Sequence, residues 1–139
     1  MHKRIALPFM LTATVALGLT AIANEKPSAD FQSVMKSNGA TTMALRDHIT
    51  AKNYDAIATD AATLKANFAK IEAFWTAKKV DDAITFAKTG AKGAADLETA
   101  AKAKNDAGIA SANMAIGGTC GGCHRAHREQ LPDKSYEIK

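Results

Sequence analysis

Apolar residues recur along the chain at alternating spacings of three and four residues, the repeat of a helix with one buried face. The clearest stripe lies in residues 54–75 and consists of Tyr54, Ile57, Ala61, Leu64, Phe68, Ile71 and Trp75. Weaker stripes of the same kind occupy residues 29–51, 81–104 and 106–131, and Pro132 is a stop signal after the last. Four helices joined by short connections predict an all-α fold, an antiparallel four-helix bundle.

Composition supports helices rather than sheet, because alanine is the commonest residue and aromatic residues make up only 6%. Alanine-rich stripes bury little apolar area, so a large apolar group at the centre would stabilise such a bundle. Gly90 and Gly93 each weaken the third helix by about 1 kcal/mol relative to alanine, and a break is most easily made there. Asp106 is the expected N-cap of the fourth helix, and the polar residues 133–139 are expected to be loose.

The first 23 residues have the three parts of a secretory signal peptide. A basic start is followed by an apolar run, and the run ends in Ala21-Ile22-Ala23, an A-x-A cleavage signal. The alternative is a transmembrane anchor. The helix breakers Pro8 and Gly18 and the barely sufficient length of the run argue against it. We therefore expect cleavage after Ala23 and export to the periplasm.

The mature protein would then be residues 24–139, with no membrane segment left after cleavage. Removing Lys3 and Arg4 leaves 16 basic and 14 acidic residues of the original 18 and 14. A balance near neutrality without a dense basic run does not indicate a nucleic-acid partner. Neither a repeat nor a linker divides residues 24–139, so a single bundle domain is predicted.

Cys120-Gly121-Gly122-Cys123-His124 is a C-x-x-C-H sequence, the attachment pattern of c-type haem. A three-residue offset brings both thiols to one side of a helical turn, where each can meet a vinyl group of the same ring. The histidine after the second cysteine can then bind the iron. We expect one covalently bound haem c, enclosed by the bundle. The backbone beside it is expected to lie against the flat ring, because side chains are missing at Gly117, Gly118, Gly121 and Gly122.

Three other readings of the two cysteines are weaker. A thioredoxin-like site is expected near a βαβ pattern, which the sequence does not show. A zinc site needs further ligands, and no second Cys/His pair stands at a usual spacing. A disulfide between Cys120 and Cys123 has poor geometry within a helix.

The second axial ligand of the iron has five candidates in the sequence: Met35, Met43, Met114, His48 and His127. Met114 and His127 belong to the same predicted helix as the first ligand and would lie on the wrong side of the ring. On the first helix, Met43 lies about 80° and His48 about 140° from Met35, which is near the middle of the apolar stripe. Periodicity alone leaves Met35 as either a ligand or a core residue.

The chain resembles the class II c-type cytochromes, the cytochrome c-prime and cytochrome c-556 group. In that family the haem motif lies on the last helix and an arginine follows its histidine by four residues, as Arg128 follows His124. The segment around Met35 is similar to the one in which low-spin c-556 members place a ligating methionine. The resemblance implies that Met35 is the sixth ligand, that Arg128 pairs with a haem propionate, and that His127 packs on the haem where the family usually has Phe or Tyr.

The expected function is periplasmic electron transfer, because histidine–methionine ligation raises the potential and leaves no open site on the iron. The partners would be periplasmic redox proteins, and the resemblance adds an antiparallel homodimer as a candidate assembly. An enzyme is not expected, because neither a proton shuttle nor a substrate cleft can be read from the sequence. The alternatives are a five-coordinate cytochrome c-prime type binder or sensor of nitric oxide or other small gases, and a haem-free thiol or metal-handling protein.

Overall fold

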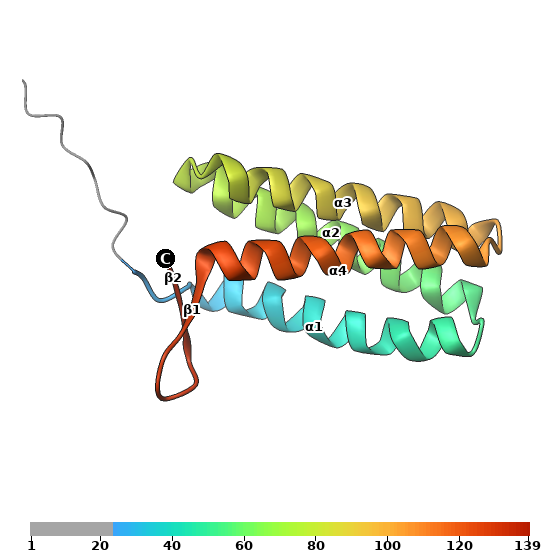
Figure 1. Ribbon diagram of the computed structural model, residues 1–139, viewed down its shortest axis with the longest axis horizontal. Helices are drawn as coiled ribbons and strands as arrows, with labels where there is room; N and C mark the ends of the chain where they lie inside the picture. The colour runs from blue at the N-terminus through green and yellow to red at the C-terminus, as the bar shows by residue number, and fades with distance from the viewer. Residues whose placement is uncertain (1–23) are drawn as a thin grey trace, which may run out of the picture.

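The computed structural model describes residues 24–139, and the predicted signal peptide lies outside the described residues. Four helices make up the bundle: α1 (Ala29–Thr50), α2 (Tyr54–Lys78), α3 (Asp81–Lys102) and α4 (Asp106–His127). Successive helices run in opposite directions and are joined by short turns (Figure 1). The predicted all-α fold with four antiparallel helices is confirmed. None of these helices is long and apolar enough to cross a membrane.

Each of the three turns between helices has a lysine in the left-handed region, and the first and third turns also have an asparagine cap. Asn53 and Asn105 each accept a hydrogen bond from a backbone N–H at the start of α2 and α4, at 3.2 and 3.0 Å. Asn105 is therefore the N-cap of α4, one residue before the predicted Asp106. Lys52, Lys79 and Lys104 have φ angles of 52°, 59° and 52°. These caps and turns keep the connections as short as the sequence predicts.

The stripe on α2 is buried as predicted, from Ile57 to Trp75. α3 passes through Gly90 and Gly93 without the break that their weak helix propensity allowed. A Cβ at Gly90 would lie 2.3 Å from Phe68 Cε1, and one at Gly93 would lie 3.1 Å from Ile116 Cγ1. The two glycines therefore let α3 approach its neighbours closely on both sides.

The C-terminal segment corrects two predictions. α4 ends at His127 rather than at residue 131, and residues 133–139 are not loose. Strand β1 (Arg128–Gln130) pairs antiparallel with β2 (Tyr136–Ile138), and Ile138 is buried. Glu25 extends this pairing, with N···O distances of 3.0 and 2.8 Å to Ile138. The hairpin is stabilised by the backbone hydrogen bonds to Glu25 and by the burial of Ile138. Both are contacts between distant parts of the chain, so the helical periodicity of the sequence could not predict them.

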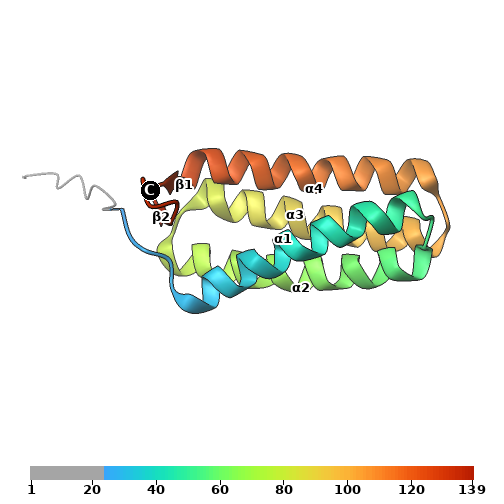
Figure 2. The same ribbon diagram turned by 90° about the horizontal axis from the view of Figure 1, so that it is seen from below.

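α1 packs on α2, α2 on α3 and α3 on α4, which makes a continuous layer of contacts. α1 runs obliquely to the other three helices, and the hairpin lies at the end of the bundle where α4 finishes and α1 starts (Figures 1 and 2). Residues of α1 and α4 together line two cavities. The fold thus leaves space between its first and last helices.

Candidate cofactor site

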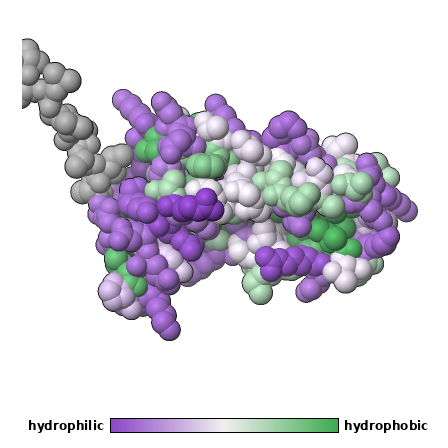
Figure 3. Space-filling view, in the orientation of Figure 1, coloured by the Kyte–Doolittle hydropathy of each residue, from purple (hydrophilic) through white to green (hydrophobic). Residues whose placement is uncertain are grey.

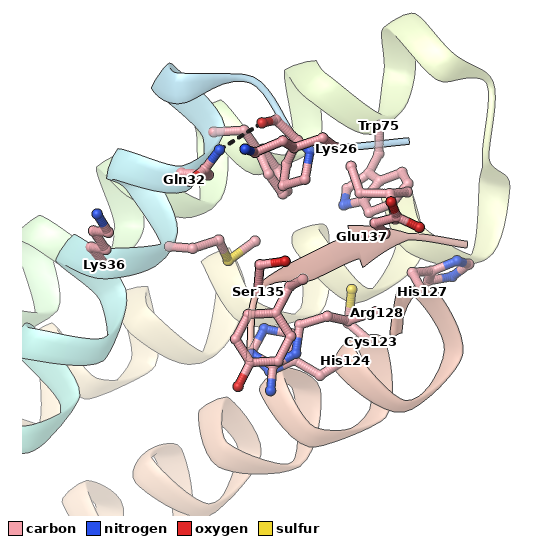
Figure 4. Close-up of a pocket in the computed structure, with 15 residues that line it drawn as sticks. Lys26, Gln32, Lys36, Trp75, Cys123, His124, His127, Arg128, Ser135 and Glu137 are labelled. Carbon is pink, nitrogen blue, oxygen red and sulfur yellow. Dashed lines mark hydrogen bonds between the residues drawn. The ribbon is translucent and has the colours of Figure 1, made fainter. Parts of the chain in front are cut away.

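Two neighbouring cavities lie between α1 and α4. The larger, about 330 Å³, reaches the C-terminal hairpin, and the smaller, about 240 Å³, extends between the aromatic side chains of α2 and α3. They share four lining residues: Met35, Cys123, His124 and Arg128. Figure 4 shows Cys123 and His124 on α4 beside the larger cavity, with the hairpin closing its other side. Volumes of roughly 300–1,000 Å³ are typical of ligand sites.

The two cysteines of the motif are free thiols on α4, and both line the smaller cavity. Burial raises the pKa of Cys120 above its ordinary value. Burial, with smaller contributions from Cys120 and Asp82, raises the pKa of Cys123 to about 11. Both groups are therefore protonated at neutral pH, unlike the thiolates of metal sites and of thiol–disulfide exchange. Among residues 24–139 no cluster of three or more His, Cys, Asp and Glu could hold a metal ion.

His124 is a neutral imidazole at neutral pH. Burial is the main cause that lowers its pKa, and the charge of Arg128 lowers it further. His124 lines both cavities from α4. A neutral ring nitrogen is the form in which histidine binds a metal.

The five candidates for the second axial ligand lie in very different places. Met35 lines both cavities from α1, the helix across from His124. Met43 and Met114 are 69% and 71% exposed, and neither lines a cavity described above. His48 Nδ1 lies 2.7 Å from Asp60 Oδ2, so this ring is already partnered. Met35 is thus the candidate sulfur that the fold brings to the same space as His124.

The chain departs from helical geometry at Arg128, directly after the end of α4. Arg128 has φ −125° and ψ 130°, so it is extended rather than one helical turn beyond His124. Its guanidinium lies 4.0 Å from the ring centroid of Tyr136, and the residue still lines both cavities. His127 Nε2 lies 3.0 Å from Asp82 Oδ2, and the ring centroid is 5.1 Å from that of Trp75. His127 therefore lies at the end of the larger cavity, partnered to α3.

The glycines of the motif region have different surroundings from those expected. A Cβ at Gly122 would lie 2.7 Å from Phe86 Cε1, so Gly122 makes room for a side chain of α3. A Cβ added at Gly117, Gly118 or Gly121 would meet nothing within 4 Å. Gly39 on α1 likewise has open space, and it lines the smaller cavity. The glycine that leaves a wall of the cavity flat therefore belongs to α1.

Two polar atoms at the cavities were not predicted from the sequence. Within residues 24–139, Trp75 Nε1 and Asn38 Oδ1 are the buried side-chain polar atoms without a hydrogen-bond partner. Trp75 lines the larger cavity and Asn38 the smaller. Leaving such a group unpaired costs about 1–3 kcal/mol. The sequence did hold one signal for this, because Asn38 is a polar residue on the apolar stripe of the first helix. The two unpaired atoms indicate that a polar ligand or water occupies the cavities.

Comparisons of the chain with models of known protein families, with curated proteins and with solved structures gave no match. The residues at the cavities nevertheless fit a haem by their chemistry. Two protonated thiols and a neutral imidazole stand on one helix, a thioether stands on the facing helix, and the walls between them are largely aromatic and aliphatic. The buried indole N–H without a partner adds a donor that a haem carboxylate would satisfy.

Proposed function

We propose that this protein is a periplasmic electron-transfer c-type cytochrome that holds one covalent haem c between α1 and α4. The observation that carries the proposal is the position of the C-x-x-C-H motif. Its two thiols and its imidazole line the same space as Met35 of the opposite helix. The resemblance to the class II c-type cytochromes supports the same assignment.

Each residue of the site has one role. Cys120 and Cys123 would hold the haem through two thioethers, each made by addition of an S–H bond across a vinyl group, with sulfur on one carbon, hydrogen on its neighbour and no net oxidation. His124 and Met35 would bind the iron from α4 and α1. A bound haem supplies a one-electron Fe(III)/Fe(II) couple, and histidine–methionine ligation raises its potential.

The surrounding side chains exclude water from the site. Phe68 and Ile71 of α2 and Phe86 of α3 line the smaller cavity, and Phe31 of α1 lines the larger. A low-dielectric wall disfavours the more highly charged oxidation state, which is a second means of raising the potential. The redox partners would be other periplasmic proteins, and a homodimer stays a candidate assembly.

A gas-binding function is the second candidate, and one observation favours it. Asn38 is 7% exposed, its Oδ1 has no partner, and it follows Met35 on the same helix by three residues. Asn38 lines the smaller cavity, and the NH2 group of its amide is a donor that could hydrogen-bond a diatomic ligand on five-coordinate iron. In that case Met35 would be a core residue and the protein a binder or sensor of nitric oxide or a similar gas.

One preparation tests both candidates. The chain is expressed with a haem-maturation system, the exported protein is sequenced from its N-terminus, and the haem is extracted with acidified acetone. We expect Asn24 as the first residue and colour that stays with the polypeptide. Colour that moves into the solvent would refute the covalent attachment, and a Cys120→Ser, Cys123→Ser variant is the control without thioethers.

The spin state then separates electron transfer from gas binding. Low-spin ferric iron with a weak long-wavelength sulfur-to-iron band is expected in the wild type. Met35→Ala should become high-spin and bind carbon monoxide readily, whereas the matched variant Met43→Ala should change neither property, because Met43 is 69% exposed. A wild type that is already high-spin would reject the electron-transfer assignment in favour of gas binding.

A further inference from the structure

Trp75 is the one tryptophan of the chain, and its ring is held firmly at the larger cavity. It is 3% exposed. Its ring meets Phe31 and Phe74 edge to face, with centroids 6.1 and 5.1 Å apart, and His127 lies 5.1 Å away on another side. These contacts bury the apolar part of the indole and fix its orientation. They leave Nε1 without a hydrogen-bond partner.

The two cavities differ in the chemistry of their walls. Three cationic side chains, Lys26, Lys36 and Arg128, line the larger cavity together with Trp75, against one carboxylate, Glu137 (Figure 4). This end of the molecular surface is largely hydrophilic in the view of Figure 3. Cys120 lines the smaller cavity and not the larger. Cys123 and Arg128 line both cavities, whereas Trp75, Lys26 and Lys36 line only the larger, so Cys120 and Trp75 mark opposite ends of the combined space.

We infer that the Trp75 N–H donates a hydrogen bond to a carboxylate of the haem, at the end of the site next to the C-terminal hairpin. The inference rests on the proposed function. A haem has its two vinyl groups and its two carboxylates at different edges, and attachment at Cys120 and Cys123 turns the carboxylates away from the thiols. A carboxylate removed from water needs donors, and an N–H bond to an ionised group is about twice as strong as a neutral one.

Trp75 is therefore a positioning residue that adjusts the potential of the iron through the carboxylate. The bond offsets part of the negative charge near the iron. Its loss favours the ferric state, and the midpoint potential falls. Lys26 and Arg128 are more exposed than Trp75. Solvent and salt therefore screen their charges more strongly and reduce their effect on the potential of the iron.

The test uses the holoprotein and begins with ultraviolet resonance Raman spectroscopy of its single tryptophan. The indole band that reports N–H bonding is expected to show a strong hydrogen bond. A free N–H in the holoprotein would overturn the inference. Because a water molecule would also give a bonded signal, the spectrum is combined with the midpoint potential of two variants.

Trp75→Phe keeps an aromatic ring at this position and removes the N–H. Phe74→Leu is the control, because it disturbs the same aromatic cluster and keeps the Trp75 N–H. We expect a lower midpoint potential in Trp75→Phe and a potential close to the wild type in Phe74→Leu. An unchanged or raised potential in Trp75→Phe, or an equal fall in both variants, would overturn the inference. Absence of covalent haem from the wild type would instead reject the proposed function, so the two failures are distinguishable.

Discussion

Gly90 is the position where a single methyl group has the largest predictable effect on the bundle. In Gly90→Ala the new Cβ would lie 2.3 Å from Cε1 and 2.5 Å from Cζ of Phe68. Ordinary carbon contacts are about 3.5–4.0 Å, so the ring must move by more than about 1 Å. Phe68 is 3% exposed and lines the smaller cavity, so the cavity is the free space beside the ring and a displaced ring would fill part of the site. Such overpacking costs about 1–3 kcal/mol.

The matched control is Gly118→Ala on α4, where nothing lies within 4 Å of the added Cβ. Both changes gain about 1 kcal/mol of helix propensity, so this gain cancels in their difference. We expect Gly90→Ala to be about 1–3 kcal/mol less stable than Gly118→Ala, at the upper end when haem fills the cavity. Urea unfolding of the two holoproteins, followed by circular dichroism, measures the difference. Equal midpoints at equal slopes would refute the close-approach role of Gly90.

Three further predictions concern the turns and the hairpin. Lys79→Gly should raise the free energy of unfolding by about 0.5–1 kcal/mol in urea titrations, because Lys79 has φ 59°, and a loss would contradict this. Hydrogen bonds from Lys52 and Tyr54 lower the pKa of Asp106 below 3.8. Its stabilisation is therefore present above that pH and lost below it, so Asp106→Asn should lose less stability between pH 7 and about pH 3 than the wild type does. Ile138→Ala should release the hairpin and speed its cleavage by trypsin, whereas an unchanged rate would show that burial of Ile138 does not hold it.

The sequence determined the features that depend on near neighbours along the chain. The stripe from Ile57 to Trp75 defines a helix because its repeat matches 3.6 residues per turn, and the structure buries the same residues. The chemistry of Cys120, Cys123 and His124 is also local, since it follows from a three-residue offset and an adjacent imidazole. Both kinds of pattern involve separations of a few residues, and tertiary contacts do not have to be known to interpret them.

Only the tertiary structure decided the features that join distant parts of the chain. α4 stops at His127, and the next residue, Arg128, pairs with Ile138, which also pairs with Glu25, 113 positions before it; helical periodicity does not report such contacts. Periodicity left Met35 open between core and ligand, and the oblique path of α1 brings it to the cavity of His124. Trp75 reads as a core residue in the stripe, yet its Nε1 is left unpaired at the cavity. Whether a buried polar atom has a hydrogen-bond partner depends on the atoms that surround it in space. Those neighbours are defined only when all four helices and the hairpin are in place.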